Sequence, residues 1–125
     1  MILSIALAVS AVCANPQTQA EMNQCAAADF ASADKALNAV WPKVRGVMQA
    51  RDKATGKPTD GRPGYYAALL DAQRAWLRYR DGQCQVAGYS MRGGSAEPMV
   101  VSGCKAKLTQ ARVAELKALA GEFGR

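Results

Sequence analysis

Apolar side chains recur at intervals of three and four residues along three long stretches of the chain, which is the pattern of amphipathic helices. The first stretch begins at Thr18, where the sequence Thr-Gln-Ala-Glu matches a capping box. Pro42 lies inside this stretch, and because the apolar pattern resumes directly beyond it, we expect a kink rather than an end of the helix. The apolar face comprises Met22, Cys25 or Ala26, Phe30, Ala33, Leu37, Val40 or Trp41, Val44 and Val47 or Met48.

Two loops separate the predicted helices. Residues 53–64 contain three glycines and two prolines, which excludes a helix there. A second helix is expected over residues 65–86, followed by a glycine-rich loop over residues 88–95. Ser95 is the expected cap of a third helix that has Glu97 and Pro98 in its first turn and continues to about Ala120. Since no stretch alternates with period two, the sequence predicts an all-α fold, a small antiparallel bundle of three main helices in a single domain.

The first eleven residues are uncharged and mostly apolar, which is typical of the apolar region of a secretory signal peptide. They are too few to span a bilayer. The basic residues that usually open such a signal are missing, which leaves two interpretations, a start upstream of Met1 or a weak signal. Cleavage after Ala11 or after Ala14 fits the small-residue rule. We favour Ala11, because residues 12–125 then retain an even set of cysteines, and we expect a periplasmic or secreted protein.

The four cysteines allow three disulfide pairings, and sequence alone does not select among them. Cys13 lies shortly before the first helix and Cys25 about two turns inside it, whereas Cys84 and Cys104 flank the second loop. This placement favours Cys13–Cys25 and Cys84–Cys104. A lipid anchor on Cys13 is the competing interpretation, although Val12 is a poor match to the small residue expected before it. Because the chain has no Cys-x-x-Cys pattern and no histidine, neither a redox site nor a metal site is predicted.

No group of residues forms a recognisable catalytic centre. Without histidine, general acid–base chemistry would fall to carboxylates. The formal Ser-x-x-Lys motif at residues 102–105 lacks the companion motifs of serine penicillin-binding enzymes. Asp34 and Arg80 lie beside the apolar faces of the first and second helices, and we interpret them as an ion pair or hydrogen bond between helices. We therefore predict neither an enzyme nor a bound cofactor.

The formal net charge is +6, with 16 basic and 10 acidic residues. A basic protein is attracted to anionic surfaces such as phospholipid headgroups, cell-wall polymers or nucleic acid. Export makes nucleic acid the least expected of these partners. The charge therefore favours an anionic cell-wall or lipid surface.

Residues 73–84, Gln-Arg-Ala-Trp-Leu-Arg-Tyr-Arg-Asp-Gly-Gln-Cys, resemble the hallmark segment of the LprI-like family of bacterial envelope proteins, which is named for a lysozyme inhibitor. Elements in the first and third helices agree, including residues 18–26, residues 93–95, Thr109 and Arg112, and the resemblance spans nearly the whole mature chain. Trp41 stands where the family more often has tyrosine. The candidate structural or binding positions that the resemblance marks are Glu21, Asn23, Asp34, Asn38, Gln73, Trp76, Arg80 and Asp81.

The resemblance implies an exported protein-binding module whose partner is lysozyme or another envelope protein. An inhibitor must occupy a cleft in which two carboxylates do the chemistry, so a loop with a cationic or hydroxyl tip is suitable. Our candidate is the second loop, with Tyr89, Ser90 and Arg92; the alternative is a plain turn between disulfide-linked helices. Charge argues against inhibition, because animal-type lysozymes are strongly basic and would be repelled unless a local acidic patch compensates. The second hypothesis is a structural module that associates with anionic envelope surfaces without inhibiting lysozyme.

Overall fold

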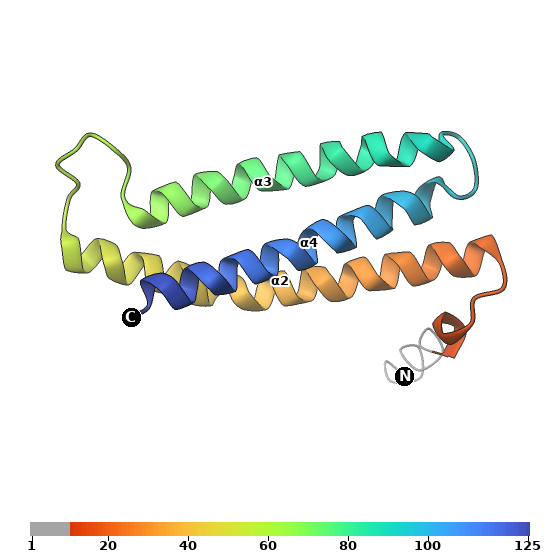
Figure 1. The fold of residues 1–125 in the computed structure, drawn as a ribbon, viewed down its shortest axis with the longest axis horizontal. Helices are drawn as coiled ribbons and strands as arrows, with labels where there is room; N and C mark the ends of the chain where they lie inside the picture. Colours follow the sequence, from red (N-terminus) through yellow and green to blue (C-terminus); the bar gives the residue numbers. More distant parts are fainter. Residues whose placement is uncertain (1–10) are drawn as a thin grey trace.

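The computed structural model describes residues 11–125, and these form three long helices, of which the second runs antiparallel to the first and third (Figure 1). The helices are α2 (Gln19–Thr55), α3 (Tyr65–Gly88) and α4 (Glu97–Phe123), and the short 3-10 helix η1 (Tyr89–Met91) follows α3. The predicted all-α class is confirmed. The predicted signal peptide covers residues 1–11, of which residues 1–10 lie outside the described part of the chain. None of the described helices is long and apolar enough to cross a membrane.

The start of α2 follows the capping signal in the sequence. The Thr18 hydroxyl accepts a hydrogen bond from the Glu21 amide at 3.1 Å. The Glu21 carboxylate accepts in return from the amide of Gln17 at 2.7 Å, one residue before the amide that the capping box predicts. The helix passes through Pro42 and ends at Thr55. The prediction that the loop begins at Lys53 is therefore wrong, since residues 53–55 belong to α2.

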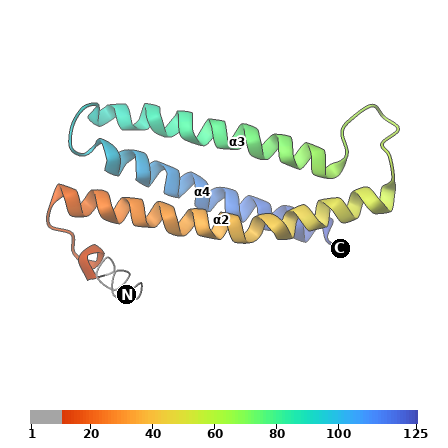
Figure 2. The ribbon, with the colours of Figure 1, turned by 180° about the vertical axis from the view of Figure 1, so that it is seen from behind.

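The core lies mainly between α2 and α4, which run side by side, while α3 packs more against α4 than against α2 (Figure 2). The predicted apolar face of α2 is confirmed at its buried positions. Tyr66, Trp41 and Trp76 pack partly buried against this core. The buried apolar cluster consists of Leu37, Val40, Val44 and Met48 from α2, Leu69 from α3, and Val113 and Leu116 from α4.

Both expected disulfides are present. Cys13 is bonded to Cys25 and Cys84 to Cys104, with Cα–Cα distances of 5.5 and 5.4 Å. A lipid anchor on Cys13, the competing interpretation, would require this disulfide to be absent, because one sulfur cannot form both bonds.

The start of α4 differs from the expectation. Its N-cap is Ala96, which makes no side-chain cap hydrogen bond, so the assignment of Ser95 as the cap is wrong. The backbone carbonyl of Ser95 instead accepts a hydrogen bond from the side-chain amide of Asn23 at 2.9 Å, which joins α2 to the turn before α4. Glu97 and Pro98 occupy the first turn, as predicted.

The bundle has two unlike ends (Figure 1). One end contains η1, the start of α2 and the N-terminal segment. The other contains the loop of residues 56–64 and the C-terminus. At this second end, the Asp52 carboxylate accepts hydrogen bonds from the amides of Tyr65 and Tyr66 at 2.7 and 3.1 Å. Asp52 thus caps α3 from a different helix, since the N-cap residue Gly64 has no side chain to do so.

Candidate functional site

The loop that joins α3 to α4 contains the candidate binding residues and is referred to below as the η1 loop (residues 89–96). Tyr89 and Met91 are 42% and 50% exposed, and Ser90 and Arg92 are also exposed. The guanidinium carbon of Arg92 lies 4.3 Å from the centroid of the Tyr89 ring, a cation–π contact. The loop therefore presents a cation stacked on an aromatic ring at one end of the bundle.

Hydrogen bonds hold this loop in shape. The amide of Arg92 donates to the carbonyl of Tyr89 at 3.2 Å, and the amide of Gly94 donates to the carbonyl of Met91 at 2.9 Å. The Tyr89 hydroxyl lies 2.8 Å from the side-chain amide nitrogen of Gln85, one turn earlier on α3. Sequence reasoning missed Gln85, although its spacing of four residues from Tyr89 indicates the contact.

The base of the η1 loop is narrow because α3 and α4 approach closely there. A Cβ atom on Gly88 would lie 2.5 Å from a methyl group of Val101, so any other residue requires the Val101 side chain or the helices to shift. The Cys84–Cys104 disulfide lies one turn before Gly88 and joins the same two helices. The loop is thus fixed to a rigid base.

A hollow of about 580 Å³ lies beside the η1 loop, between the end of α3 and the start of α4. The Asp81 carboxylate in its wall accepts a hydrogen bond from Arg80 at 2.9 Å and lies 3.8 Å from the ammonium group of Lys105. Glu97, also in the wall, forms no ion pair with any residue of the described chain. The hollow is lined by Asp81, Gln85, Tyr89, Glu97, Pro98, Val101, Ser102 and Lys105.

Three of the positions marked by the family resemblance meet in a buried network between the helices. Gln73 accepts a hydrogen bond from Arg112 at 2.9 Å, and both side chains are buried. The guanidinium carbons of Arg80 and Arg112 lie 5.3 and 5.9 Å from the Trp76 ring centroid. The contacts of Arg112 with Gln73 and Trp76 join α4 to α3 inside the bundle.

The expected contact between Asp34 and Arg80 is not formed. Arg80 bonds to Asp81 and reaches the Thr109 hydroxyl at 3.4 Å, and its guanidinium lies 5.1 Å from the Phe30 ring centroid. Asp34 makes no side-chain hydrogen bond or ion pair within residues 11–125. An adjacent carboxylate and a fully buried hydroxyl therefore satisfy Arg80 in place of the carboxylate on α2.

The remaining marked positions are spread along α2. Glu21 and Asn23 lie at its start, where they hold the N-terminal segment and the turn before α4. Asn38 is exposed and makes no side-chain hydrogen bond to another described residue. The structure therefore does not bring Asp34 and Asn38 together with the η1 loop.

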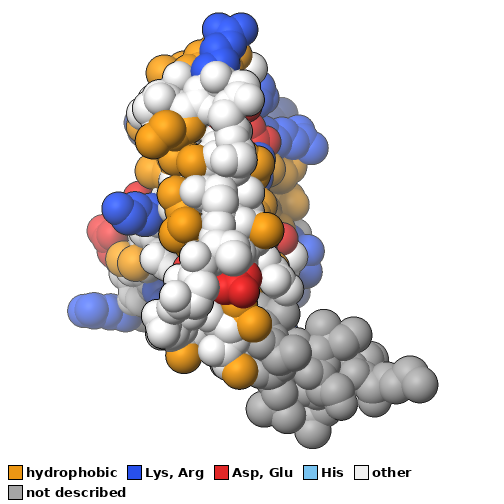
Figure 3. Space-filling view, turned by 90° about the vertical axis from the view of Figure 1, so that its right-hand side faces the viewer, with side chains coloured by type: hydrophobic (Ala, Val, Ile, Leu, Met, Phe, Trp, Pro, Cys, Tyr) orange, Lys and Arg blue, Asp and Glu red, His pale blue; other side chains and the backbone are white. Residues whose placement is uncertain are grey.

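Charge is divided unequally along the bundle. The half nearer the η1 loop, residues 11–35 and 80–105, contains four basic and five acidic residues, a balance of −1. The other half, residues 36–79 and 106–125, contains twelve basic and five acidic residues, a balance of +7. Figure 3 shows the end face that carries the η1 loop, where uncharged and hydrophobic side chains predominate and basic side chains lie at the edges. We call the two parts the η1 half and the basic half.

Comparison with known proteins gives two matches. The family described as "Lysozyme inhibitor LprI" matches residues 11–116. An uncharacterized protein of Rhizobium meliloti (strain 1021) is 50% identical over 107 residues, which cover 86% of this chain and 77% of the relative. No solved structure matches. The chain belongs to the LprI family, as the resemblance in the sequence had indicated.

Proposed function

Because this chain is a member of the LprI family, we propose that it is an exported protein-binding module of the bacterial envelope that inhibits lysozyme through its η1 loop. The observation that carries the proposal is the ordered tip of the η1 loop, by which we mean Tyr89, Ser90 and Arg92. There the guanidinium carbon of Arg92 lies 4.3 Å from the centroid of the Tyr89 ring, at an exposed end of the bundle. The family description supports lysozyme as the partner.

The chemistry of the tip suits the cleft of a lysozyme. Two carboxylates flank the scissile bond in that cleft, one as general acid and the other as nucleophile or electrostatic stabiliser. A guanidinium donates up to five hydrogen bonds in a planar fork, so Arg92 could be held by both carboxylates at once. The hydroxyl of Ser90 offers a further donor and acceptor beside it. A loop that is already ordered loses less conformational entropy on binding than a flexible one.

The division of charge weakens the electrostatic objection to this proposal. The 37 residues of α2 give the bundle a length of about 55 Å. The Debye length is only about 8 Å at physiological ionic strength, so a partner at one end is screened from most charges at the other. A basic enzyme that approaches the η1 half therefore meets a region whose balance is −1 rather than the +6 of the whole chain.

The test is a cell-wall turbidity assay with purified lysozyme and excess inhibitor. Wild-type protein is expected to slow the loss of turbidity. Arg92→Gln removes the cation from the tip and is expected to weaken inhibition about 30-fold or more, the usual effect of removing one member of a desolvated charge pair. The matched control is Arg78→Gln, because Arg78 is an exposed arginine on α3 without an ion-pair partner among the described residues.

Two results would contradict the proposal. Lysis that proceeds unchanged at large molar excess of wild-type protein would exclude lysozyme inhibition and leave a structural envelope module as the function. Equal inhibition by wild-type and Arg92→Gln protein would show that another surface binds the enzyme.

A further inference from the structure

We propose that the basic half of the bundle docks on anionic phospholipid headgroups through the end that contains the loop of residues 56–64, so that the η1 loop faces away from the lipid surface. This proposal does not depend on lysozyme inhibition. It begins from the division of charge, since the basic half has a balance of +7 and the η1 half of −1. A rod with this distribution is oriented by an anionic surface before it makes contact.

Several cations of the basic half are available to a partner. Lys53, Lys57 and Lys117 are exposed, and none has a carboxylate of the described chain within ion-pair distance. Arg74 and Arg78 on α3 share these two properties. A cation that has no internal partner keeps its full interaction with an external phosphate, because no existing ion pair must first be broken.

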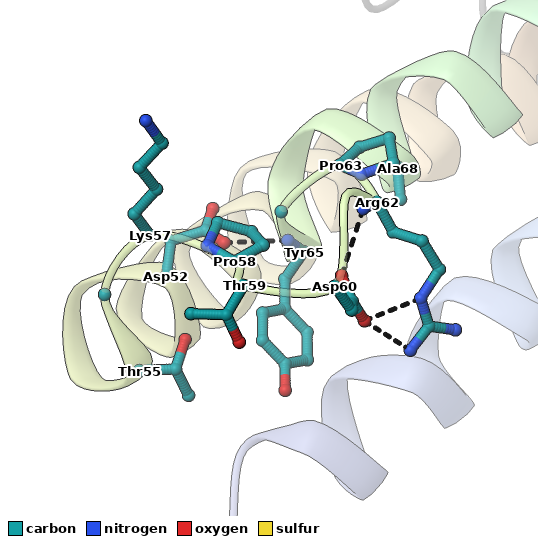
Figure 4. Close-up of a pocket in the computed structure, with 12 residues that line it drawn as sticks. Asp52, Thr55, Lys57, Pro58, Thr59, Asp60, Arg62, Pro63, Tyr65 and Ala68 are labelled. Carbon is teal, nitrogen blue, oxygen red and sulfur yellow. Dashed lines mark hydrogen bonds and ion pairs between the residues drawn. The ribbon is translucent and has the colours of Figure 1, made fainter.

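Two carboxylates at the loop end, those of Asp52 and Asp60, are already engaged (Figure 4). The Asp60 carboxylate is 2.6 Å from a guanidinium nitrogen of Arg62, and the Asp52 carboxylate faces the amides at the start of α3. These residues line a second hollow, formed by the end of α2, the loop and the start of α3. Lys57, in contrast to the two carboxylates, extends away from the other residues that line this second hollow (Figure 4). The loop therefore directs a cation outward while the carboxylates of Asp52 and Asp60 face groups of the same chain. Glu122, near the end of α4, is exposed and forms no ion pair with a described residue, so it offsets one of the cations at this end.

An aromatic edge beside these cations favours a lipid surface over a cell-wall polymer. Tyr65 is 37% exposed, and its ring centroid lies 6.0 Å from that of Phe123 in an edge-to-face arrangement. Aromatic side chains with one apolar and one polar end are enriched at the headgroup level of membranes. A hydrophilic wall polymer offers no apolar layer for such rings, whereas the boundary between headgroups and acyl chains does.

The experiment is co-sedimentation of the full chain with vesicles, using circular dichroism to confirm that every variant is folded. Wild-type protein is expected to sediment with phosphatidylglycerol:phosphatidylcholine (1:1) vesicles at about 0.1 M salt, where the Debye length is about 10 Å, and to remain in solution with pure phosphatidylcholine. Lys53→Gln combined with Lys57→Gln is expected to weaken partitioning about 30-fold, because each cation near an anionic bilayer contributes about fivefold. Added salt should weaken wild-type binding steeply.

The matched control is Lys35→Glu, an exposed lysine on the η1 half. The control and the double variant each lower the net charge by two, so the two proteins differ in where the charge is removed. Lys35→Glu is expected to change partitioning by less than about threefold, since its side chain lies several Debye lengths from the loop end. Equal weakening by both variants would overturn oriented docking and leave net charge as the cause.

Other outcomes also overturn the proposal. Failure of wild-type protein to sediment with the anionic vesicles excludes a lipid surface. Binding to purified cell wall without binding to vesicles would show that the partner of the basic half is a cell-wall polymer and not a lipid. Turbidity assays on the same variants separate this question from the proposed function, because neither Lys53 nor Lys57 belongs to the η1 loop.

Discussion

The two ends of the bundle are held together by different kinds of interaction. At the end with the η1 loop, the Cys84–Cys104 disulfide joins α3 to α4 and the Cys13–Cys25 disulfide fixes the N-terminal segment to α2. At the loop end, the described residues form no covalent link. The Asp52 carboxylate caps α3 there, and the side chain of Arg51 donates a hydrogen bond to the carbonyl of Phe123 at 2.8 Å.

This difference shows how a protein with a small hydrophobic core can hold the η1 loop in one conformation. The seven buried apolar residues of the main cluster come from the middle and the loop end of the helices, from Leu37 to Leu116. Between this cluster and the η1 half, polar and small residues such as Thr109 and Ala106 replace large apolar ones in the interior. A disulfide restricts the unfolded chain without requiring a large buried area, which suits a region where little apolar surface is available.

The largest effect is expected from removing the covalent link beneath the η1 loop. Cys84→Ala combined with Cys104→Ala opens a loop of 20 residues and is expected to lower the free energy of unfolding by about 3 kcal/mol. Urea denaturation followed by circular dichroism measures this change.

The corresponding change at the other disulfide is the control. Cys13→Ala with Cys25→Ala is expected to cost about 1 kcal/mol, because most residues of the segment before α2 are exposed and can detach without disturbing the bundle. Equal losses in the two double variants would mean that the N-terminal segment is an integral part of the cooperative unit.

A smaller effect is expected at the loop end, where Asp52 provides the cap of α3. Asp52→Ala leaves the amides of Tyr65 and Tyr66 without their acceptor and is expected to cost about 1 kcal/mol, the usual value for a lost N-cap. Urea denaturation again gives the measurement. Asp71→Ala is the matched control, since Asp71 is an exposed carboxylate on α3 without a described ion pair. No difference between the two variants would show that water replaces the cap at no cost.

The smallest effect concerns the pH response of the same end. The side-chain hydrogen bond from Arg62, and then the backbone amide of Arg62, lower the pKa of Asp60 below its ordinary value. A carboxyl whose pKa is lowered in the folded state contributes stability above its unfolded pKa, and this contribution is lost as the pH falls through the folded value. Arg62→Gln is expected to raise the pKa of Asp60 only part of the way to the ordinary value, because the backbone amide remains.

Side-chain carboxyl NMR across an acid titration measures this shift. Arg74→Gln is the control, since Arg74 makes no ion pair with Asp60 and its replacement should leave the titration unchanged. An Asp60 pKa that is the same in wild-type and Arg62→Gln protein would show that the ion pair does not persist in solution.

Much of the fold could be predicted because its signals are local. The Thr18 cap, the spacing of apolar residues on α2 and the glycines and prolines of the first loop all act within a few residues. The same signals favoured the disulfide pairing that is present, because the expected helix boundaries placed each cysteine near one partner. The predicted Ser95 cap was wrong, since a contact from Asn23 on α2 holds that turn, and a pattern within one segment does not show such a contact.

The candidate site was predictable in place but not in detail. The residues Tyr89, Ser90 and Arg92 stood out as a glycine-flanked loop, and the structure presents them at one end of the bundle. Their binding role is still a prediction. The stacking of Arg92 on Tyr89 depends on the path of the backbone through the 3-10 turn, which the order of residues does not specify.

Sequence by itself determined that this chain is a disulfide-linked helical domain, because helical periodicity, capping and the positions of the cysteines can be recognised from residues that are close together in the sequence. Tertiary structure decided which buried groups satisfy one another: Arg80 with Asp81 and Thr109 rather than with Asp34, and Asp52 with the start of α3. It also divides the net charge of +6 between one half with a balance of −1 and another with a balance of +7, because the antiparallel arrangement brings together segments that are distant in the sequence. The η1 loop acquires its local electrostatic environment only through that folding.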